Sequence, residues 1–398
     1  MQGSSGRRIA LLVGAVVIAA ILLPVGARAI SSRYHDDSLW ANSLRSVAGL
    51  QVPYDFAIFL QAGQAVRDGA SPYVGADAVI AEDQPAPYAY PPLLAIVVAP
   101  LSFLPEKVAG SSTPGMLFTL VLIACVIGTM VALGVSDWRC YPIALLYPPV
   151  LENLEYGAIG PILALLVALG WRYRDRPSGA AATAVGIAVV LKVFLWPLVV
   201  WLAATRRWRA AVLAVVTGVG LAVVSWAVIG FRGLLDYPSL LRRLSDLEAE
   251  NSYSAFATLR ALDVPELAAR SFVVAVAAAL LVLAWRAARA SDDAAEADRR
   301  SLTLALAAGL VLTPILWLHY LVLLIVPIAL ARPKLSALWF APLALTLFEA
   351  LDWYRGWPRG DGPALTSVAL VVVVVFVGAL RSGGPDTRRA APALSRGH

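Results

Sequence analysis

Cysteine and histidine are both scarce in this chain of 398 residues, which has two cysteines and three histidines. Cys125 lies inside an apolar run and Cys140 directly after one, so neither a disulfide framework nor a cysteine-based metal site is available. The histidines, His35, His319 and His398, are too scattered to form a zinc cluster. No acidic pair has the spacing of metal ligands. We therefore expect neither a metal ion nor another cofactor.

Charged residues are few as well, at 15% of the chain against 60% hydrophobic residues, and the mean hydropathy is +0.74. This composition excludes a soluble multidomain protein and is typical of a polytopic membrane protein. The formal net charge of +6 could suggest nucleic-acid binding, but the basic residues stand in small groups between apolar runs and form no basic face. Orientation in a membrane explains their placement better.

Uncharged stretches suited to crossing a bilayer recur along the chain, since a membrane helix needs about 20 mostly apolar residues. The first follows Arg7 and Arg8 but lacks a small-residue cleavage pattern, so we interpret it as a retained span and not as a signal peptide. The ten expected crossings are residues 9–27, 90–105, 114–136, 157–171, 210–231, 271–288, 301–318, 320–331, 335–350 and 364–380. The sequence thus predicts an all-α membrane helix bundle with both termini on the same side.

Two further apolar pieces do not fit as full crossings. Residues 140–151 are short and broken by three prolines, and residues 180–204 are interrupted at Lys192 and at Pro197. Arginines flank the second piece on both sides, at Arg172, Arg174 and Arg176 and at Arg206, Arg207 and Arg209. A single crossing would put one arginine group on the wrong side, so we predict a re-entrant hairpin or a broken helix pair.

The charges divide unequally between the two sides of this path. Cytoplasmic segments carry 19 Lys and Arg with 7 acids, and external segments carry 12 Arg with 19 acids, which gives net charges of +12 and −7. The long polar segments, 28–89, 232–270 and 351–363, are then external, and any chemistry takes place on the outer face. The longest cytoplasmic loop, 287–300, is a small mixed-charge connection. We expect one membrane domain over the whole chain, with a disordered cytoplasmic tail at 381–398.

The first external loop contains an amphipathic segment that begins at Asp55. Apolar residues at positions 56, 59, 60, 63 and 66 have helical spacing, which predicts a helix on the membrane surface. Asp55 has two compatible interpretations. One is an N-cap that accepts hydrogen bonds from the free amides of the first turn. The other is a catalytic base at the boundary between water and lipid.

Two polar residues interrupt the apolar runs. Inserting an ionisable group such as Lys192 into a membrane costs on the order of 3 kcal/mol, so this lysine is expected to face a polar cavity and contact a phosphate. The alternative is a structural pairing with Glu152 or Glu155. His319 divides an otherwise uncharged stretch, residues 301–331, and falls at the outer boundary, where it is either an interfacial or a functional residue.

Polar and aromatic residues of the external loops offer weaker signals. The run Glu250-Asn251-Ser252, with Arg260, is interpreted either as part of a capped loop helix or as a strip that contacts sugar. Aromatic residues near the expected boundaries favour a belt at the membrane interface over sugar stacking. They are Tyr88, Tyr90, Trp353, Tyr354 and Trp357.

An ordered series of motifs runs through the chain from about residue 50 to 335. Its first part comprises Asp55-Phe56, Ala62-Gly63, Gly69, Ser71-Pro72-Tyr73 and Tyr88-Ala89-Tyr90-Pro91-Pro92. Its second part comprises residues 157–163, Lys192 to Pro197, Arg206-Arg207-Trp208-Arg209, Asn251-Ser252, Thr313-Pro314, Trp317 and His319-Tyr320. No single motif is specific, but in this order they resemble glycosyltransferase family 87, which belongs to the GT-C superfamily of integral-membrane enzymes.

Two positions depart from that family's pattern. Gly157-Ala158 stands where many members have Gly-Gln, and Trp317-Leu318-His319-Tyr320 stands where many have a run like Trp-Asp-His-His. The loss of one histidine argues against a mechanism that needs two imidazoles, and it indicates a subfamily with its own acceptor.

The resemblance implies an inverting enzyme that moves mannose from a polyprenyl-phosphate-mannose donor to a glycolipid or lipoglycan acceptor like phosphatidylinositol mannoside. The transfer is expected on the outer face of the plasma membrane, with an alpha-1,2 linkage formed. Asp55 corresponds to the presumed general base, and His319 is the second catalytic candidate. Residues expected to contact the donor or its phosphate are Lys192, Arg260 and Tyr90. Those expected to contact the acceptor sugar are Glu250, Asn251 and Glu155.

Two alternatives stay open. The same fold could use a different polyprenyl-phosphate sugar, such as arabinose or glucose. A lipid or solute transporter would also use an intramembrane lysine and proline-broken helices. The chain shows no convincing internal repeat, however, and transport does not require so long a first loop.

Overall fold

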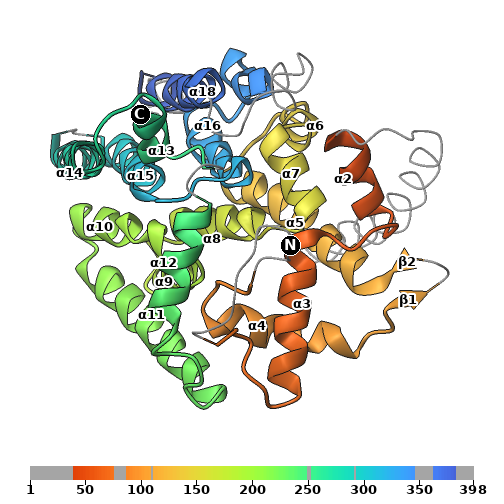
Figure 1. The fold of residues 1–398 in the computed structure, drawn as a ribbon. Coiled ribbons are helices and arrows are strands. Elements are labelled where there is room, and N and C mark those ends of the chain that lie inside the picture. Colours follow the sequence, from red (N-terminus) through yellow and green to blue (C-terminus); the bar gives the residue numbers. More distant parts are fainter. Residues whose placement is uncertain are drawn as a thin grey trace, which may run out of the picture.

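The computed structural model describes residues 39–75, 87–108, 111–248, 252–290, 293–345 and 362–381, and these are almost entirely helical (Figure 1). The only strands among them form a two-residue antiparallel pair, β1 (Lys107–Val108) and β2 (Ser111–Ser112). The predicted all-α architecture is therefore confirmed for this part of the chain.

The helices are mostly short, because prolines and polar residues break the apolar runs. Those of the first half are α2 (Leu39–Val47), α3 (Tyr54–Arg67), α4 (Pro92–Val98), η1 (Ala99–Phe103), α5 (Thr113–Ala132), α6 (Cys140–Leu145), α7 (Pro148–Tyr156), α8 (Gly160–Arg172), α9 (Ala180–Leu191), η2 (Val193–Leu195) and α10 (Pro197–Ala204), where η denotes a 3-10 helix. Those of the second half are α11 (Trp208–Val228), α12 (Tyr237–Leu247), α13 (Ala255–Ala261), α14 (Glu266–Ala290), α15 (Ala294–Leu312), η3 (Leu318–Leu324), α16 (Ile325–Ala331), η4 (Ala337–Leu345) and α18 (Gly362–Arg381).

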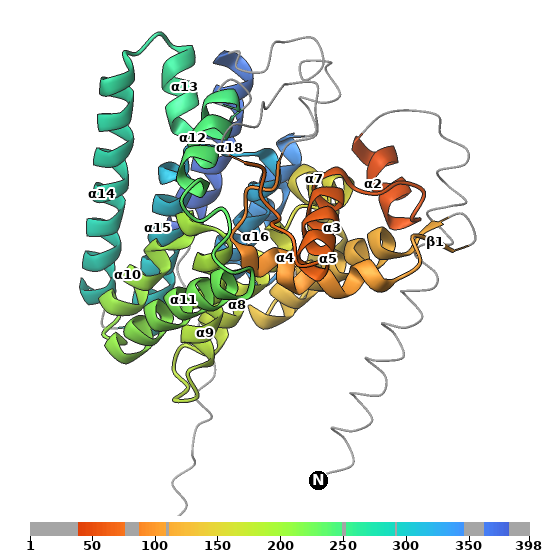
Figure 2. The same ribbon diagram turned by 60° about the horizontal axis from the view of Figure 1, so that its bottom comes forward.

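Three of the described helices, α5, α11 and α14, are long and apolar enough to cross a membrane. α11 and α14 leave many apolar side chains exposed, including Val216, Val223 and Val274. Such side chains are unfavourable in water but not against lipid tails, which are equally apolar. α14 packs along α15 on its inner side (Figure 2). These features, with several shorter apolar helices, are those of a membrane protein.

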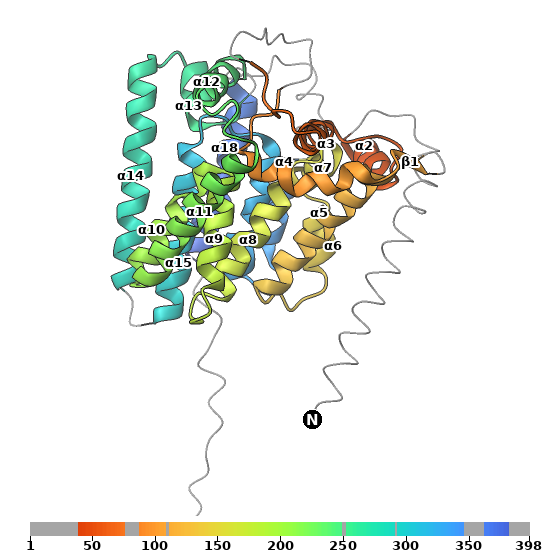
Figure 3. The same ribbon diagram turned by 90° about the horizontal axis from the view of Figure 1, so that it is seen from below.

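The two long loops predicted to be external gather at one end of the molecule. In Figure 3, α2 and α3 from the first loop and α12 and α13 from the second lie at the same end, and α3 is seen end-on across the direction of α14. α3 buries Phe56, Phe59 and Gly63 and half-buries Leu60 and Val66, so its predicted apolar face is confirmed. Its place on a membrane surface stays a prediction.

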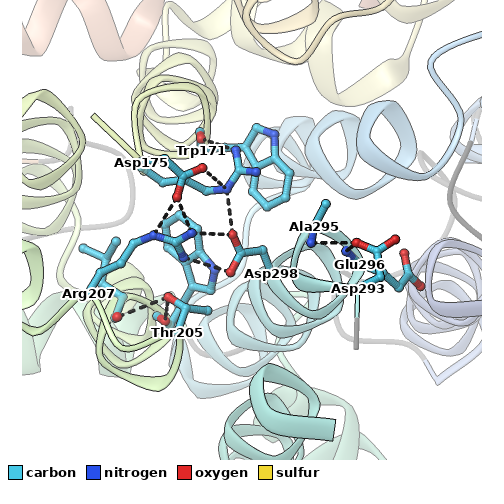
Figure 4. Close-up of polar contacts among 11 residues, drawn as sticks. Trp171, Asp175, Thr205, Arg207, Asp293, Ala295, Glu296 and Asp298 are labelled. Carbon is cyan, nitrogen blue, oxygen red and sulfur yellow. Dashed lines mark hydrogen bonds and ion pairs between the residues drawn. The ribbon is translucent and has the colours of Figure 1, made fainter. Parts of the chain in front are cut away.

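Residues 180–204 form a helical hairpin that enters and leaves the bundle at one end. α9 ends at Lys192, where the backbone is extended with φ −145° and ψ 104°, and the chain returns through η2 and α10. Asp298 of α15 holds the two ends together, because it accepts hydrogen bonds from Arg174 Nε at 2.8 Å and from Arg207 Nη2 at 2.6 Å. Figure 4 shows Arg207 between Asp298 and Asp175. The predicted broken helix pair is confirmed.

The path between residues 90 and 156 differs from the predicted one. Ser112, which the prediction places in the cytoplasm, donates its backbone N–H to the oxygen of Gly49 in the first external loop at 2.7 Å. Ser136, at the outer end of the predicted crossing 114–136, donates its backbone N–H to the oxygen of Pro333 in a predicted cytoplasmic turn at 2.9 Å. α5 therefore runs in the direction opposite to the predicted one. The chain returns through α6 and α7, whose Glu155 contacts Asn42 of the first predicted external loop. Which of the short apolar segments cross a membrane stays a prediction.

Charge counting could not detect this reversal. The connection before α5 carries Glu106 and Lys107 and the connection after it carries Asp137 and Arg139, so exchanging the two leaves each side with the same charge. Helix length does not distinguish the two paths either, because α4 with η1 and α6 with α7 are both shorter than a full crossing. The seven residues of α4 and the five of η1 rise about 20 Å, against about 30 Å of hydrocarbon.

The C-terminal third also departs from prediction in detail. α14 continues to Ala290 and α15 begins at Ala294, so most of the predicted mixed-charge connection 287–300 is helical. In the predicted crossing 335–350, the described residues form the 3-10 helix η4, which contains Pro342. Residues 346–361, the tail beyond 381 and the first predicted crossing, 9–27, lie outside the described residues. The count of ten crossings stays a prediction.

Candidate active site

Asp55 is the second residue of α3, and Pro53 occupies the N-cap position, so the predicted capping role is wrong. As an acid in the first turn, Asp55 still gains from the helix dipole. Its side chain keeps some contact with solvent, yet burial raises the pKa of Asp55 to about 7. The charge of Lys192 opposes this rise, and the carboxylate of Glu248 adds to it. A carboxylate with this proton affinity suits general-base catalysis near neutral pH.

The turn between α7 and α8 fixes where α3 begins. Gly157 ends α7 in the left-handed conformation, with φ 69°. A Cβ on this residue would lie 2.7 Å from the Cβ atoms of both Pro53 and Phe56. Phe56 in turn stacks on Phe118, with the ring centroids 4.5 Å apart. Glycine is required here by conformation and by contact, and the contact holds the residues on either side of Asp55.

Lys192 lies at the tip of the hairpin, with its ammonium among aromatic rings. Its Nζ donates to Tyr320 Oη at 2.5 Å and lies 4.0 Å from the ring centroid of Tyr90 and 4.8 Å from that of Tyr320. Ring faces attract a cation, and the attraction strengthens as water is excluded. Lys192 makes no direct ion pair with an acid in the described part of the chain, although its charge acts on Asp55.

An aromatic cluster holds Tyr90 in place. Tyr73 Oη donates to Tyr90 O at 2.8 Å, and the Tyr73 ring stacks on Trp226 with centroids 5.1 Å apart. Tyr88 is buried, and its hydroxyl donates to Pro91 O at 2.7 Å. Tyr88 and Tyr90 thus belong to one packed aromatic cluster, with their ring centroids 6.0 Å apart, and a place in a belt at the membrane interface stays a prediction for both.

His319 is buried in η3 with 6% of its surface exposed, so it is not an interfacial residue. Its Nδ1 lies 3.9 Å from Glu152 Oε2 of α7, and its backbone oxygen accepts from Asn153 Nδ2 at 2.7 Å. The Nε2 atom has no hydrogen-bond partner among the described residues. Glu152, one predicted partner of Lys192, therefore faces His319 instead.

Two motif segments that are distant in sequence meet just before His319. Ser252 is buried, and its Oγ accepts from the backbone N–H of Leu316 at 2.9 Å. The backbone N–H of Tyr253 donates to Leu316 O at 2.8 Å. The second long loop is thus anchored to the segment that leads into η3. Glu250 and Asn251, the predicted acceptor contacts next to Ser252, lie outside the described residues.

Two other predicted site residues, Arg260 and Glu155, make their hydrogen bonds elsewhere and not with Lys192. Arg260 is exposed on α13, where its Nη1 donates to Val264 O at 2.8 Å. Glu155 accepts from Asn42 Nδ2 at 2.8 Å and joins α7 to α2, so this predicted partner of Lys192 also has another contact. A role for Arg260 in donor binding and for Glu155 in acceptor binding stays a prediction. Three predicted belt aromatics lie outside the described residues: Trp353, Tyr354 and Trp357.

Tyr320 is a site residue that the sequence does not predict, although it stands in the motif His319-Tyr320 and in the run that departs from the family pattern. Its hydroxyl binds Lys192, and its ring meets that of His319 edge to face at 4.6 Å. The available signal was a single polar group at the start of an apolar run, which is too weak to interpret without the structure.

One protein family matches over most of this region. The model of glycosyltransferase family 87 matches residues 88–314. The chain belongs to glycosyltransferase family 87. For this family 87 chain the match includes Tyr90 and Lys192, whereas Asp55 and His319 lie outside it on either side. The geometry described above connects them to the matched region.

Relatives of this family 87 chain occur in mycobacteria. One from Mycolicibacterium smegmatis, named polyprenol-phosphate-mannose-dependent alpha-(1-2)-phosphatidylinositol mannoside mannosyltransferase, is 27% identical over 76% of this chain and 77% of its own length. One from Mycobacterium tuberculosis, named polyprenol-phosphate-mannose-dependent alpha-(1-2)-phosphatidylinositol pentamannoside mannosyltransferase, is 28% identical over 77% of this chain and 75% of its own length. No solved structure matches the chain.

Proposed function

We propose that this chain transfers mannose, with inversion, from polyprenyl-phosphate-mannose to a glycolipid like phosphatidylinositol mannoside and forms an alpha-1,2 linkage. The observation that carries the proposal is that the Lys192 ammonium is held by Tyr320 Oη at 2.5 Å and by the ring of Tyr90 at 4.0 Å, and forms no ion pair with Asp55 or another acid among the described residues. A base and a cation are thus both available to a substrate. The names of the two mycobacterial relatives support the donor and the class of acceptor.

In this proposal Asp55 and Lys192 act at opposite ends of the displacement. Asp55 takes the proton from the acceptor hydroxyl as its oxygen attacks the anomeric carbon. The bond from that carbon to the phosphate oxygen breaks, and the electron pair stays on the leaving polyprenyl phosphate. The Lys192 ammonium stabilises this added charge, which is worth most where water is excluded. A monophosphate leaving group then needs no metal ion.

His319 is proposed to contact either the acceptor or the donor phosphate through Nε2. The atom is buried and has no partner within the described part of the chain, and burying such a group without a hydrogen bond is unfavourable. A substrate oxygen would satisfy it.

The active site is proposed to face the outside of the plasma membrane, with both termini in the cytoplasm. Asp55 lies on α3, at the end of the molecule where both long polar loops gather (Figure 3). Arg174 and Arg207 lie together at the two ends of the hairpin, and basic residues are retained on the cytoplasmic side.

The test is transfer by the purified protein in lipid nanodiscs, with synthetic polyprenyl-phosphate-mannose and a panel of mannolipid acceptors. Wild type should form a mannosylated lipid, and Asp55→Asn of equal thermal stability should form it about 10²- to 10⁴-fold more slowly. Parallel reactions with polyprenyl-phosphate-arabinose and polyprenyl-phosphate-glucose identify the sugar. Transfer only from one of these would replace mannose in the proposal. Passage of a lipid or solute across the bilayer with no transfer from any donor would overturn the enzymatic proposal.

A further inference from the structure

Tyr320 contacts the other members of the candidate active site. Its hydroxyl accepts a hydrogen bond from Lys192 Nζ at 2.5 Å, and its ring lies edge to face against His319 at 4.6 Å. Its side chain also interacts with that of Tyr90 and with the charge of Asp55. Tyr320 is 5% exposed, so these contacts are made away from bulk solvent.

The ammonium of Lys192 has two possible partners. One is the Tyr320 hydroxyl with the ring face of Tyr90, which it binds in this structure. The other is the Asp55 carboxylate, which shares the site and attracts it. Opposite charges attract more strongly where water is largely excluded, so a direct ion pair is the natural alternative. Such a pair would stabilise the carboxylate and make it a poor base.

We infer that Tyr320 is a positioning residue that holds the Lys192 ammonium away from the Asp55 carboxylate, so that the cation remains available to the donor phosphate and the carboxylate to the acceptor proton. This inference rests on the proposed function and assigns a role to a residue that the reaction itself does not require.

The packing around Tyr320 fixes the position of its hydroxyl, which accepts the hydrogen bond from Lys192. Its ring packs against that of Phe194 of η2, with centroids 5.5 Å apart. A Cβ on Gly309 of α15 would lie 2.7 Å from Phe194 O, so α15 approaches η2 at backbone distance. Lys192 and Tyr320 thus belong to segments packed together through Phe194, and their hydrogen bond has little freedom to shift.

The groups that face Asp55 come from four segments of the chain. They are Lys192 after α9, Glu248 after α12, Tyr90 before α4 and Tyr320 in η3. Lys192 is the cation that acts on Asp55, and His319 faces Lys192. Removing the Tyr320 hydroxyl leaves every charge in place and removes its hydrogen bonds with Lys192 and with Tyr90.

The experiment is the pH dependence of kcat/KM for mannose transfer by wild type, Tyr320→Phe and Tyr320→Leu. When Lys192 pairs with Asp55, the carboxylate is stabilised and its pKa falls, so the acidic limb should move to lower pH by about one unit or more. The plateau rate should fall as well, because a weaker base accepts the acceptor proton less readily. Two variants are used so that poor folding of one does not prevent the test.

The matched control is Tyr147→Phe. Tyr147 is a buried tyrosine whose hydroxyl donates to Trp339 O at 2.6 Å, so its loss also removes one buried hydrogen bond. In this control the acidic limb of the pH profile of kcat/KM should lie at the same pH as in wild type. An unshifted limb in folded Tyr320 variants, or an equal shift in Tyr147→Phe, would overturn the inference while leaving the proposed function intact. Absence of transfer by wild type would instead overturn the proposed function.

Discussion

Gly157 and Phe56 approach so closely that a Cβ on the glycine would lie 2.7 Å from the Cβ of the phenylalanine. Gly157→Ala should therefore destabilise the fold and displace the start of α3. Left-handed backbone costs an alanine about 1–2 kcal/mol, and overpacking adds about 1–3 kcal/mol. We expect a lower melting temperature in detergent and a loss of transfer activity greater than the loss of folded protein.

The control for this substitution is Gly134→Ala. Gly134 also has a left-handed backbone, with φ 78°, but nothing lies within 4 Å of the position of its Cβ. Gly134→Ala should be destabilised by the left-handed backbone alone, and its transfer activity per folded molecule should equal that of wild type. Equal losses of activity in both variants would mean that contact with α3 does not matter.

The pH profile of transfer should report the ionisation of Asp55. Because burial raises its pKa to about 7, and a general base must be deprotonated, kcat/KM should rise with pH through about 7 and level off above it. Asp55→Asn should lower kcat by about 10²- to 10⁴-fold and abolish this limb. Asp68→Asn, at the exposed end of the same helix, should retain both the rate and the limb.

Lys192→Met should weaken use of the donor more than use of the acceptor. Loss of a hydrogen bond from a charged group costs about 1.5–3 kcal/mol, or about 10- to 100-fold in kcat/KM for the donor. Since the lysine charge lowers the pKa of Asp55, the acidic limb should also move to higher pH. Steady-state kinetics with each substrate varied in turn would check this. Unchanged donor kinetics would identify a structural lysine.

Asp298→Ala should destabilise the hairpin, because two arginines lose their shared partner. Breaking a buried pair by removing one member costs about 3–5 kcal/mol. Asp175→Ala removes a carboxylate that also binds Arg207 but is 63% exposed, so its cost should be about 0–1 kcal/mol. Thermal unfolding in detergent compares the two. Similar melting temperatures would show that Asp298 is not a buried anchor.

Transfer should persist in EDTA. The proposed reaction uses Lys192 for the phosphate charge, and the described residues contain no group of three or more His, Cys, Asp or Glu side chains able to hold a metal ion. Activity before and after chelation, with a divalent ion added back, decides this. If transfer activity were lost in EDTA and recovered with the divalent ion, the mechanism would include a metal ion.

Periodicity and charge predicted some elements and failed for others for identifiable reasons. The apolar face of α3 and the break at Lys192 follow from side-chain spacing and from six arginines around one apolar segment. The direction of α5 could not be predicted, because the connections on either side of it each carry one acid and one base. Proline was also misleading, since Pro148 and Pro149 stand in the first turn of α7, where proline is tolerated.

In the candidate site, too, some residues can be predicted from the sequence and others cannot. Asp55, Lys192 and His319 stand out by residue type and by their place in an ordered series of motifs. The hydroxyl of Tyr320 and the glycine at 157 act through contacts between residues far apart in the sequence, and no local pattern contains that information. Arg260 is predicted from its charge alone, and charge does not specify which way a loop helix faces.

The hairpin also bears on the order in which the chain is assembled in the membrane. Because its two ends lie together at Asp298, insertion of the hairpin from one side would leave the flanking arginines on that side and carry only Lys192 into the bilayer. Asp298 lies 91 residues after Arg207. The ribosome therefore synthesises α11, α12, α13 and α14 before Asp298 can bind the arginines at the two ends of the hairpin. His319 and Tyr320 are made later still. During biosynthesis, Lys192 therefore meets Tyr90, which is made before it, well before its hydrogen-bond partner Tyr320.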